Sequence, residues 1–183
     1  MSDVFGLTTT IKYYSYYIYG KLRSYYHFYS TETIANDSMN EIIDGIYVGD
    51  IYSASNYENL KKNNIKSIVC CVVGIDDLYP KYIDYLNLDL IDNCDENIIR
   101  VFDESNKFIE NNIKDNKKIL IHCIAGVSRS VTLLAAYLIK NYDYTPEKAL
   151  EVIREKRNIA NPNESFMKQL HKYHTDLEIT KKL

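Results

Sequence analysis

The stretch Ile119-Leu-Ile-His-Cys-Ile-Ala-Gly-Val-Ser-Arg-Ser130 places an apolar run, a glycine-containing turn and a helix-forming segment in direct succession. The apolar run predicts a short buried strand at 118–122, and the residues from Arg129 to Asn141 predict a helix. A tight turn between a strand and a helix points several backbone N–H groups at one spot, next to the positive end of the helix dipole. This segment is therefore expected to bind an anion.

The side chains of the turn predict chemistry as well as binding. Cys123 opens the turn and Arg129 closes it, with five residues between them. A thiol beside a helix N-terminus and an arginine should have a depressed pKa, within roughly 3.5–7.5, and the resulting thiolate is a nucleophile. Arg129 can hold two phosphate oxygens in its planar fork. Ser130 can donate a hydrogen bond to the sulfur and ease its departure in a second step.

The remaining residues of this stretch are expected to bind or support. Gly126 lets the backbone approach the anion closely. His122 is assigned a supporting role through hydrogen bonds rather than a proton-transfer role. Cysteines elsewhere, such as Cys70 and Cys71, are expected to be small buried apolar residues. The expected phosphate-binding N–H groups belong to Ile124, Ala125, Gly126, Val127, Ser128 and Arg129.

Outward from this stretch, strand-like and helix-like segments alternate along the chain. β-branched apolar runs predict strands, and apolar residues three and four apart predict helices. Thr145 and Pro146 form a good N-cap and first-turn proline. The alternation predicts an α/β fold with a central, mostly parallel sheet flanked by helices. The expected strands are 46–48, 66–73, 82–90 and 118–122, and the expected helices are 54–63, 97–113, 129–141, 146–157 and one that begins near 163.

The motif His-Cys-Ile-Ala-Gly-Val-Ser-Arg-Ser over residues 122–130 resembles the His-Cys-x5-Arg-Ser/Thr signature of the protein tyrosine phosphatase superfamily, in its compact dual-specificity branch. The resemblance covers residues 39–175, and it includes Gly45-Ile-Tyr-Val-Gly49, Ala136-Tyr-Leu138 and Asn161-Pro-Asn163 followed by Phe166 and Leu170. It implies a protein tyrosine phosphatase-like fold. It also implies hydrolysis of phosphotyrosine and phosphoserine or phosphothreonine in proteins through a cysteinyl-phosphate intermediate, with no metal or other cofactor.

The family also uses an aspartate as general acid on a loop before the cysteine. Asp89, Asp92 and Asp95 are the candidates, and Ile91-Asp92-Asn93 is similar to the Asp-Asn pair of the family's acid loop. Asp89 falls within the expected alternating strand and should be fixed on its face. Asp92 is therefore favoured as the acid, and the other two are expected to be solvated loop carboxylates.

Length and composition bound the function further. A chain of 183 residues, 46% hydrophobic and 26% charged, is typical of one globular domain. The net charge of −3 and the isoelectric point near 5.8 argue against a broad nucleic-acid surface. Cysteines without a CxxC pair or zinc spacing predict reduced thiols in an intracellular compartment. Neither a signal peptide nor a membrane-spanning segment is recognisable, so a soluble, cytoplasmic protein is expected.

The chain is expected to divide into a Tyr-rich N-terminal extension at 1–38, a catalytic domain at 39–175 and a C-terminal tail at 176–183. Apolar residues at steps of three and four between Val4 and Tyr25 predict that the extension is helical. The segment is expected to pack on its own domain or to be a poorly ordered tail. The alternatives are an exchanged helix that forms a homodimer, and a contact with a partner protein or a membrane surface. Cys94 lies two residues after Asp92 and is expected to be an ordinary loop cysteine, with a protective disulfide to Cys123 under oxidation as the alternative.

Two other functions compete with protein dephosphorylation. An RNA 5′-phosphatase or a phosphoinositide phosphatase binds a polyanion, which favours extra cations in or beside the turn, whereas Ile124, Ala125, Val127 and Ser128 are uncharged. A non-catalytic phosphoprotein-binding module would ordinarily lack the nucleophile or the arginine, and this chain has both.

Overall fold

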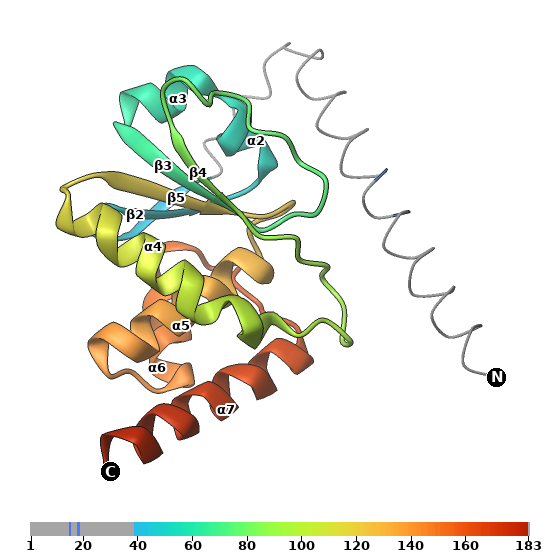
Figure 1. Ribbon diagram of the computed structural model, residues 1–183, viewed down its shortest axis with the longest axis vertical. Helices are drawn as coiled ribbons and strands as arrows, with labels where there is room; N and C mark the ends of the chain where they lie inside the picture. Colours follow the sequence, from blue (N-terminus) through green and yellow to red (C-terminus); the bar gives the residue numbers. More distant parts are fainter. Residues whose placement is uncertain (1–14, 16–17, 19–38, 183) are drawn as a thin grey trace.

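The computed structural model describes residues 39–182 together with Ser15 and Ile18, which are both helical. Apart from these two residues, the expected N-terminal extension lies outside the described part of the chain. Residues 39–182 form a central sheet with helices on both of its faces (Figure 1).

Five strands form one sheet in the order β1-β2-β5-β3-β4, with β5 at its centre. β1 runs antiparallel to β2, and all other neighbours are parallel. The expected central, mostly parallel sheet is therefore confirmed. The strands are β1 (Asn40–Ile43), β2 (Ile46–Gly49), β3 (Ile65–Cys70), β4 (Asp84–Asn87) and β5 (Lys118–His122).

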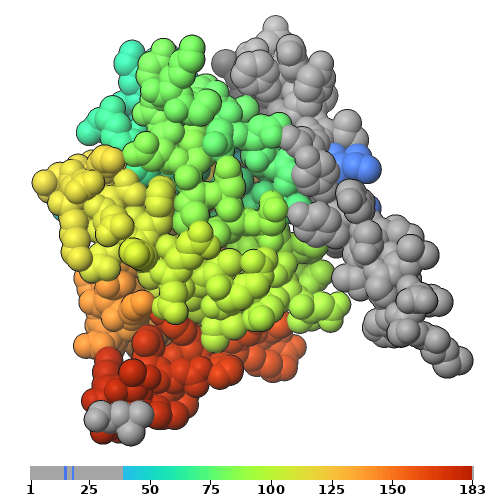
Figure 2. Space-filling view, viewed as in Figure 1, coloured from blue at the N-terminus to red at the C-terminus, as the bar shows by residue number. Residues whose placement is uncertain are grey.

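Helices cover the sheet in two unequal layers. One layer consists of two short helices, and the other has α4 and α5 against the sheet with α6 and α7 packed on α5 (Figure 1). In the space-filling view, the segment from β4 to α4 forms the front of the molecule, and α7 forms its lower edge (Figure 2). The helices are α2 (Ile51–Ser55), α3 (Tyr57–Lys62), the 3-10 helix η1 (Ile98–Val101), α4 (Phe102–Lys114), α5 (Arg129–Tyr142), α6 (Pro146–Lys156) and α7 (Glu164–Lys181).

The alternation of side chains along β5 explains why both faces of the sheet are covered. Ile119 and Ile121 belong to the apolar core that contains Phe102 of α4, whereas Leu120 belongs to the core that contains Leu60 of α3. All three β5 residues have no exposed surface. A strand that is buried on both faces is typical of a parallel sheet at the centre of an α/β protein.

Several expected boundaries were wrong. The helix expected at 54–63 is two helices, because Asn56 adopts an extended backbone, ends α2, and caps α3 by accepting a hydrogen bond from the Asn59 N–H. The strand expected at 66–73 ends at Cys70. The strand expected at 82–90 spans only Asp84–Asn87, so Asp89 lies outside it.

Other elements began or ended elsewhere than expected. The helix expected at 97–113 begins as the 3-10 turn η1, and the edge strand β1 had not been expected. Thr145 accepts the capping hydrogen bond of α6 as expected, and Asn163 caps α7. α7, expected to begin near 163, spans Glu164–Lys181, so residues 176–181 are helical. No helix in the described residues has the length and apolar character needed to cross a membrane.

Candidate active site

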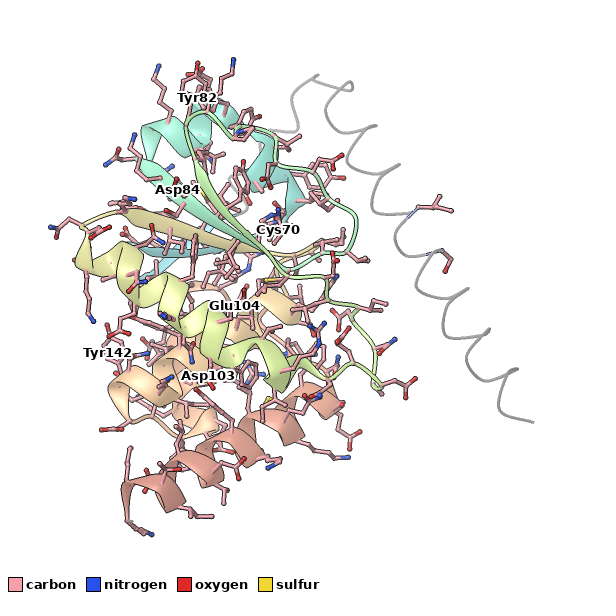
Figure 3. All side chains as sticks on the ribbon, in the orientation of Figure 1. Cys70, Tyr82, Asp84, Asp103, Glu104 and Tyr142 are labelled. Carbon is pink, nitrogen blue, oxygen red and sulfur yellow. The ribbon has the colours of Figure 1, made fainter. Side chains whose placement is uncertain are left out.

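The turn between β5 and α5 lies at the centre of the sheet. Cys123 directly follows β5, and α5 begins at Arg129. Gly49 of β2 and Cys70 of β3 both pair with His122, so three parallel strands end at this level. Figure 3 shows Cys70 in the interior, with Asp84 away from it at the beginning of the neighbouring strand. Ligands of open α/β sheets bind at such carboxyl ends.

The turn at residues 123–128 is called the catalytic loop here. Hydrogen bonds from outside this loop fix the direction of its peptide groups. The Ile51 N–H donates to the Ile124 carbonyl at 3.2 Å, and the Asn161 N–H donates to the Val127 carbonyl at 2.8 Å. Arg157 donates to the two carbonyls between them, from Nη2 to Ala125 at 3.1 Å and from Nε to Gly126 at 2.6 Å.

The four carbonyl groups therefore point away from the centre of the catalytic loop. In a trans peptide the following N–H points opposite to its carbonyl. The N–H groups of residues 125–128 consequently point inward, towards the sulfur of Cys123. Two of them reach it, because the Gly126 N–H donates to Cys123 Sγ at 3.2 Å and the Val127 N–H also hydrogen-bonds the sulfur.

Gly126 is required at its position for two reasons. Its φ of +65° is a left-handed conformation that side chains disfavour. A Cβ atom there would also lie 2.5 Å from the Gly49 carbonyl oxygen and would collide with the Arg157 guanidinium. Any other residue would force the catalytic loop away from β2.

The Cys123 sulfur is buried among donors and one cation. Burial by itself raises the pKa of this thiol. The Arg129 guanidinium, the hydrogen bonds from the Ser130 side chain and backbone, and one from the Val127 N–H act in the other direction and prevail, so the pKa of Cys123 is lower than that of an ordinary cysteine. The Ser130 hydroxyl donates to Sγ at 3.3 Å, as expected.

Two other buried cysteines show that burial alone would raise the pKa of a cysteine thiol. Burial raises the pKa of Cys70 to about 12 and that of Cys71 well above its ordinary value. Both are free thiols in the core, as expected. Cys94 is a free, exposed thiol. Since Cys123 is only 1% exposed, the two thiols of the alternative disulfide lie in different environments, Cys94 on the surface and Cys123 in the core.

Arg129 is held rigidly at the first turn of α5. Its Nη1 donates to the carbonyls of Cys71 and Leu90 at 3.2 and 3.0 Å. Its Nε is buried and has no hydrogen-bond partner among the described residues. A buried donor of this kind is costly unless an acceptor reaches it. An oxygen of a bound oxyanion would be such an acceptor.

Asp92 is the candidate acid that contacts the catalytic loop. Its Oδ1 accepts a hydrogen bond from Ser128 Oγ at 2.9 Å, and its Oδ2 lies 3.6 Å from Arg129 Nε. Asp89 contributes its backbone carbonyl to Arg100, and Asp95 is exposed, with its N–H bonded to the side chain of Asn93. The structure therefore places Asp92 beside Arg129 and Ser128, at the end of the catalytic loop.

His122 lies on the opposite face of β5 from the sulfur. Burial lowers the pKa of its imidazole to about 4, so the ring is neutral at physiological pH. Its Nδ1 lies 3.3 Å from the Cys123 carbonyl oxygen. A neutral buried ring that contacts the backbone of the nucleophile suits the supporting role expected of it.

Sequence reasoning missed two residues of the site. Arg157 directly follows α6 and holds the carbonyls of the catalytic loop, and Asn163 bonds to Asp92 through its side-chain amide at 2.9 Å. The signal for Asn163 was its place in the Asn161-Pro-Asn163 motif. Nothing in the local sequence distinguished Arg157 from the other charged residues at the end of α6. Within residues 39–182, no group of three histidine, cysteine or acidic side chains is arranged to hold a metal ion.

A comparison with protein families identifies the family to which a chain with this site belongs. The family model described as dual specificity phosphatase, catalytic domain, matches residues 46–176, which include the whole of the site. The chain belongs to the dual-specificity phosphatase family.

Relatives of this dual-specificity phosphatase are found among plant and animal proteins. It is 35% identical over 156 residues to "Protein phosphatase Slingshot homolog" of Xenopus laevis, with 83% of this chain and 23% of that protein covered. It is 32% identical over 140 residues to "Dual specificity protein phosphatase 1B" of Arabidopsis thaliana, with 76% of this chain and 84% of that protein covered. The phosphatase therefore spans less than a quarter of the Slingshot relative and most of the plant one.

Solved structures share the fold of the phosphatase. The human "tyrosine phosphatase-like serine/threonine/tyrosine-interacting protein" superposes with a TM-score of 0.73 at 33% identity, covering 76% of this chain and 97% of that one. This likeness agrees with the protein tyrosine phosphatase-like fold expected from the sequence.

Proposed function

We propose that this chain hydrolyses phosphotyrosine and phosphoserine or phosphothreonine in proteins, with Cys123 as the nucleophile. The observation that carries the proposal is the lowered pKa of a buried thiol enclosed by the Gly126 N–H, the Ser130 hydroxyl and the Arg129 guanidinium. Thiolates are nucleophiles, and phosphate dianions bind where N–H groups converge on a helix N-terminus.

In the first step a phosphate dianion docks on the N–H groups of residues 124–129 and on the Arg129 side chain. The Cys123 sulfur attacks in line, so an S–P bond forms while the P–O bond to the substrate side chain breaks. Asp92 gives its proton to the departing oxygen. Donors that are already in place stabilise the charge on the equatorial oxygens. This stabilisation provides most of the rate acceleration in phosphoryl transfer.

In the second step a water molecule replaces the departed side chain. The Asp92 carboxylate takes a proton from this water, the water oxygen bonds to phosphorus, and the S–P bond breaks. The Cys123 sulfur leaves as a thiolate and keeps the electron pair. Ser130 Oγ, at 3.3 Å from the sulfur, donates a hydrogen bond to that developing charge.

Hydrolysis of phosphopeptides and of p-nitrophenyl phosphate, with vanadate as inhibitor, tests this function. The wild-type chain should turn over both, and Cys123→Ser should bind phosphopeptide without turnover because a serine hydroxyl in this site stays protonated. Asp92→Ala should slow phosphothreonine peptides by about 10²–10⁴-fold, the usual contribution of a general acid. Activated aryl phosphates should be affected much less. Appreciable turnover by Cys123→Ser would overturn the mechanism.

The same assay separates the competing functions. The uncharged side chains of Ile124, Ala125 and Val127 favour a single phosphate over a polyanion. Inositol lipids and triphosphorylated RNA belong in the substrate panel, and faster hydrolysis of either would replace the proposal with a phosphoinositide or RNA 5′-phosphatase. Phosphopeptide binding by the wild-type chain with no turnover of any substrate would indicate a binding module.

The proposed function favours a reducing, intracellular compartment, because a thiolate nucleophile must remain unoxidised. We place the protein in the cytoplasm on this ground. The apolar stripe predicted over residues 4–25 is the basis for a proposed homodimer through this segment. The solution mass of the chain with and without residues 1–30 decides this question, since an unchanged monomeric mass would remove the dimer.

A further inference from the structure

The two carboxylate oxygens of Asp92 lie in different surroundings. Oδ1 accepts two hydrogen bonds, from Ser128 Oγ at 2.9 Å and from Asn163 Nδ2 at 2.9 Å. Oδ2 forms an ion pair with Arg129 Nε at 3.6 Å, beyond hydrogen-bond distance, and so lies on the side of the guanidinium proposed to bind phosphate. The side chain thus presents one oxygen to the protein and the other to the substrate site.

Asn163 holds its amide in one orientation. Its Oδ1 accepts the capping hydrogen bond from the Phe166 N–H at 2.9 Å, at the start of α7. Because the carbonyl side of the amide is fixed by the helix, the NH₂ side is directed at Asp92. The same amide lies 3.5 Å from the Asn93 carbonyl oxygen, so it also reaches the backbone of the acid loop.

Asn163 also orients the Ser128 hydroxyl. The Asn163 backbone N–H donates to Ser128 Oγ at 3.3 Å. With its oxygen accepting this hydrogen bond, the hydroxyl directs its own hydrogen to Asp92 Oδ1. Ser128 and Asn163 therefore act as one unit, and both donate to the same oxygen.

We propose that Ser128 and Asn163 are positioning residues that place the catalytic proton of Asp92 on Oδ2. Both lone pairs of Oδ1 face donor hydrogens, so a proton on Oδ1 would meet a donor and displace a hydrogen bond. A proton on Oδ2 faces the phosphate side, where the leaving oxygen departs. This inference rests on the proposed function, because it requires Asp92 to be the general acid.

The chain offers a variant that separates positioning from helix capping. Asn163→Ser keeps a side-chain oxygen that can cap α7, since serine caps as well as asparagine does, but it removes the amide donor to Asp92. Asn56→Ser is the matched control, because Asn56 caps α3 through an equivalent hydrogen bond to the Asn59 N–H at 3.0 Å. Ser128→Ala removes the second donor without touching the cap.

The measurement is kcat/KM for phenyl phosphate, which has a poor leaving group, and for dinitrophenyl phosphate, which needs little protonation. Asn163→Ser and Ser128→Ala should each lose about three- to tenfold on phenyl phosphate and less than about twofold on dinitrophenyl phosphate, because a misplaced proton affects only the step that uses it. Asn56→Ser should leave both rates unchanged. Equal losses of kcat/KM on both substrates would indicate a purely structural role and would overturn the inference.

A double-mutant cycle with Asp92→Ala separates this inference from the proposed function. In the Asp92→Ala background, Asn163→Ser should cause no further loss on phenyl phosphate, because no proton remains to be placed. An additive loss would overturn the positioning role while Asp92 remained the acid. If Asp92→Ala itself lowered kcat/KM equally for both substrates, the assignment of Asp92 as the acid would fail first. Melting temperatures of all variants identify any that are poorly folded.

Discussion

At the scale of single residues, the atoms around a buried sulfur decide whether the pKa of its thiol is raised or lowered. Cys70, Cys71 and Cys123 are all 1% exposed or less, yet the pKa is raised for the first two and lowered for the third. The difference is the set of donors aimed at Cys123 Sγ and the guanidinium beside it. Removing any of these donors should move the pKa of Cys123 upward.

Ser130→Ala tests this at a single hydrogen bond. Losing the 3.3 Å bond to Sγ should raise the pKa of Cys123, since the bond favours the thiolate. The pH dependence of alkylation by iodoacetamide reports that pKa directly. The variant should also show a burst of product followed by slow turnover, because the thiolate is a poorer leaving group in the second step.

Ser105→Ala is a suitable control for that experiment. Ser105 is also buried, but its hydroxyl donates to the Phe102 carbonyl within α4. It should leave the alkylation profile unchanged. An alkylation midpoint for Ser130→Ala equal to that of the wild type would contradict the assigned role of the hydroxyl.

At the scale of elements, the catalytic loop is shaped by segments far from it in sequence. The end of α6 supplies Arg157, whose guanidinium bonds to Ala125, Gly126 and, through Nη1, to Asn40 Oδ1 of β1 at 2.7 Å. β1 and α6 thus support the loop together. The turn keeps its N–H groups inward only while its carbonyls have partners outside.

Arg157→Ala should therefore weaken anion binding without removing any group that contacts the substrate. The Ala125 and Gly126 carbonyls would lose their partners, at a cost of about 2–4 kcal/mol in the free energy of unfolding. Vanadate should bind at least about tenfold more weakly, because inward N–H groups would be free to rotate away. Lys156→Ala, one residue earlier and exposed, should change neither quantity. Unaltered vanadate inhibition in Arg157→Ala would show that the loop holds its shape alone.

At the scale of the whole molecule, the buried His122 makes stability depend on pH. Burial lowers its pKa in the folded state to about 4, from 6.5 in the unfolded chain. Between these values the unfolded state binds a proton that the folded state excludes. Stability contributed by the neutral ring is therefore complete above about pH 6.5 and falls as the pH drops towards 4, by roughly 3 kcal/mol in total.

Urea unfolding at a series of pH values checks this prediction. The free energy of unfolding of the wild type should fall over that range, and His122→Asn should fall less steeply because asparagine does not titrate. The comparison of slopes isolates His122 from the carboxylates that also titrate in acid. Parallel curves for the two proteins would show that the ring is not the group responsible.

Local sequence determined the central part of this protein. β5, α5 and the spacing of Cys123 and Arg129 follow from a β-branched run, a glycine and a helix-forming segment that adjoin one another, and they were predicted within one residue. β4 was predicted too long because alternating apolar residues report burial on one face, not pairing. Leu88 and Leu90 are buried in the core although the ladder has ended at Asn87.

Tertiary structure alone decided how the site is held. The inward direction of the loop N–H groups depends on partners from Ile51, Arg157 and Asn161, and the orientation of Asp92 depends on Asn163, 71 residues away. Hydrogen bonds of this range leave no periodic signal in a sequence, because each needs only one donor at one point in space. The amino-acid sequence determined which groups are able to react. Tertiary packing determined where the protons and charges of those groups lie.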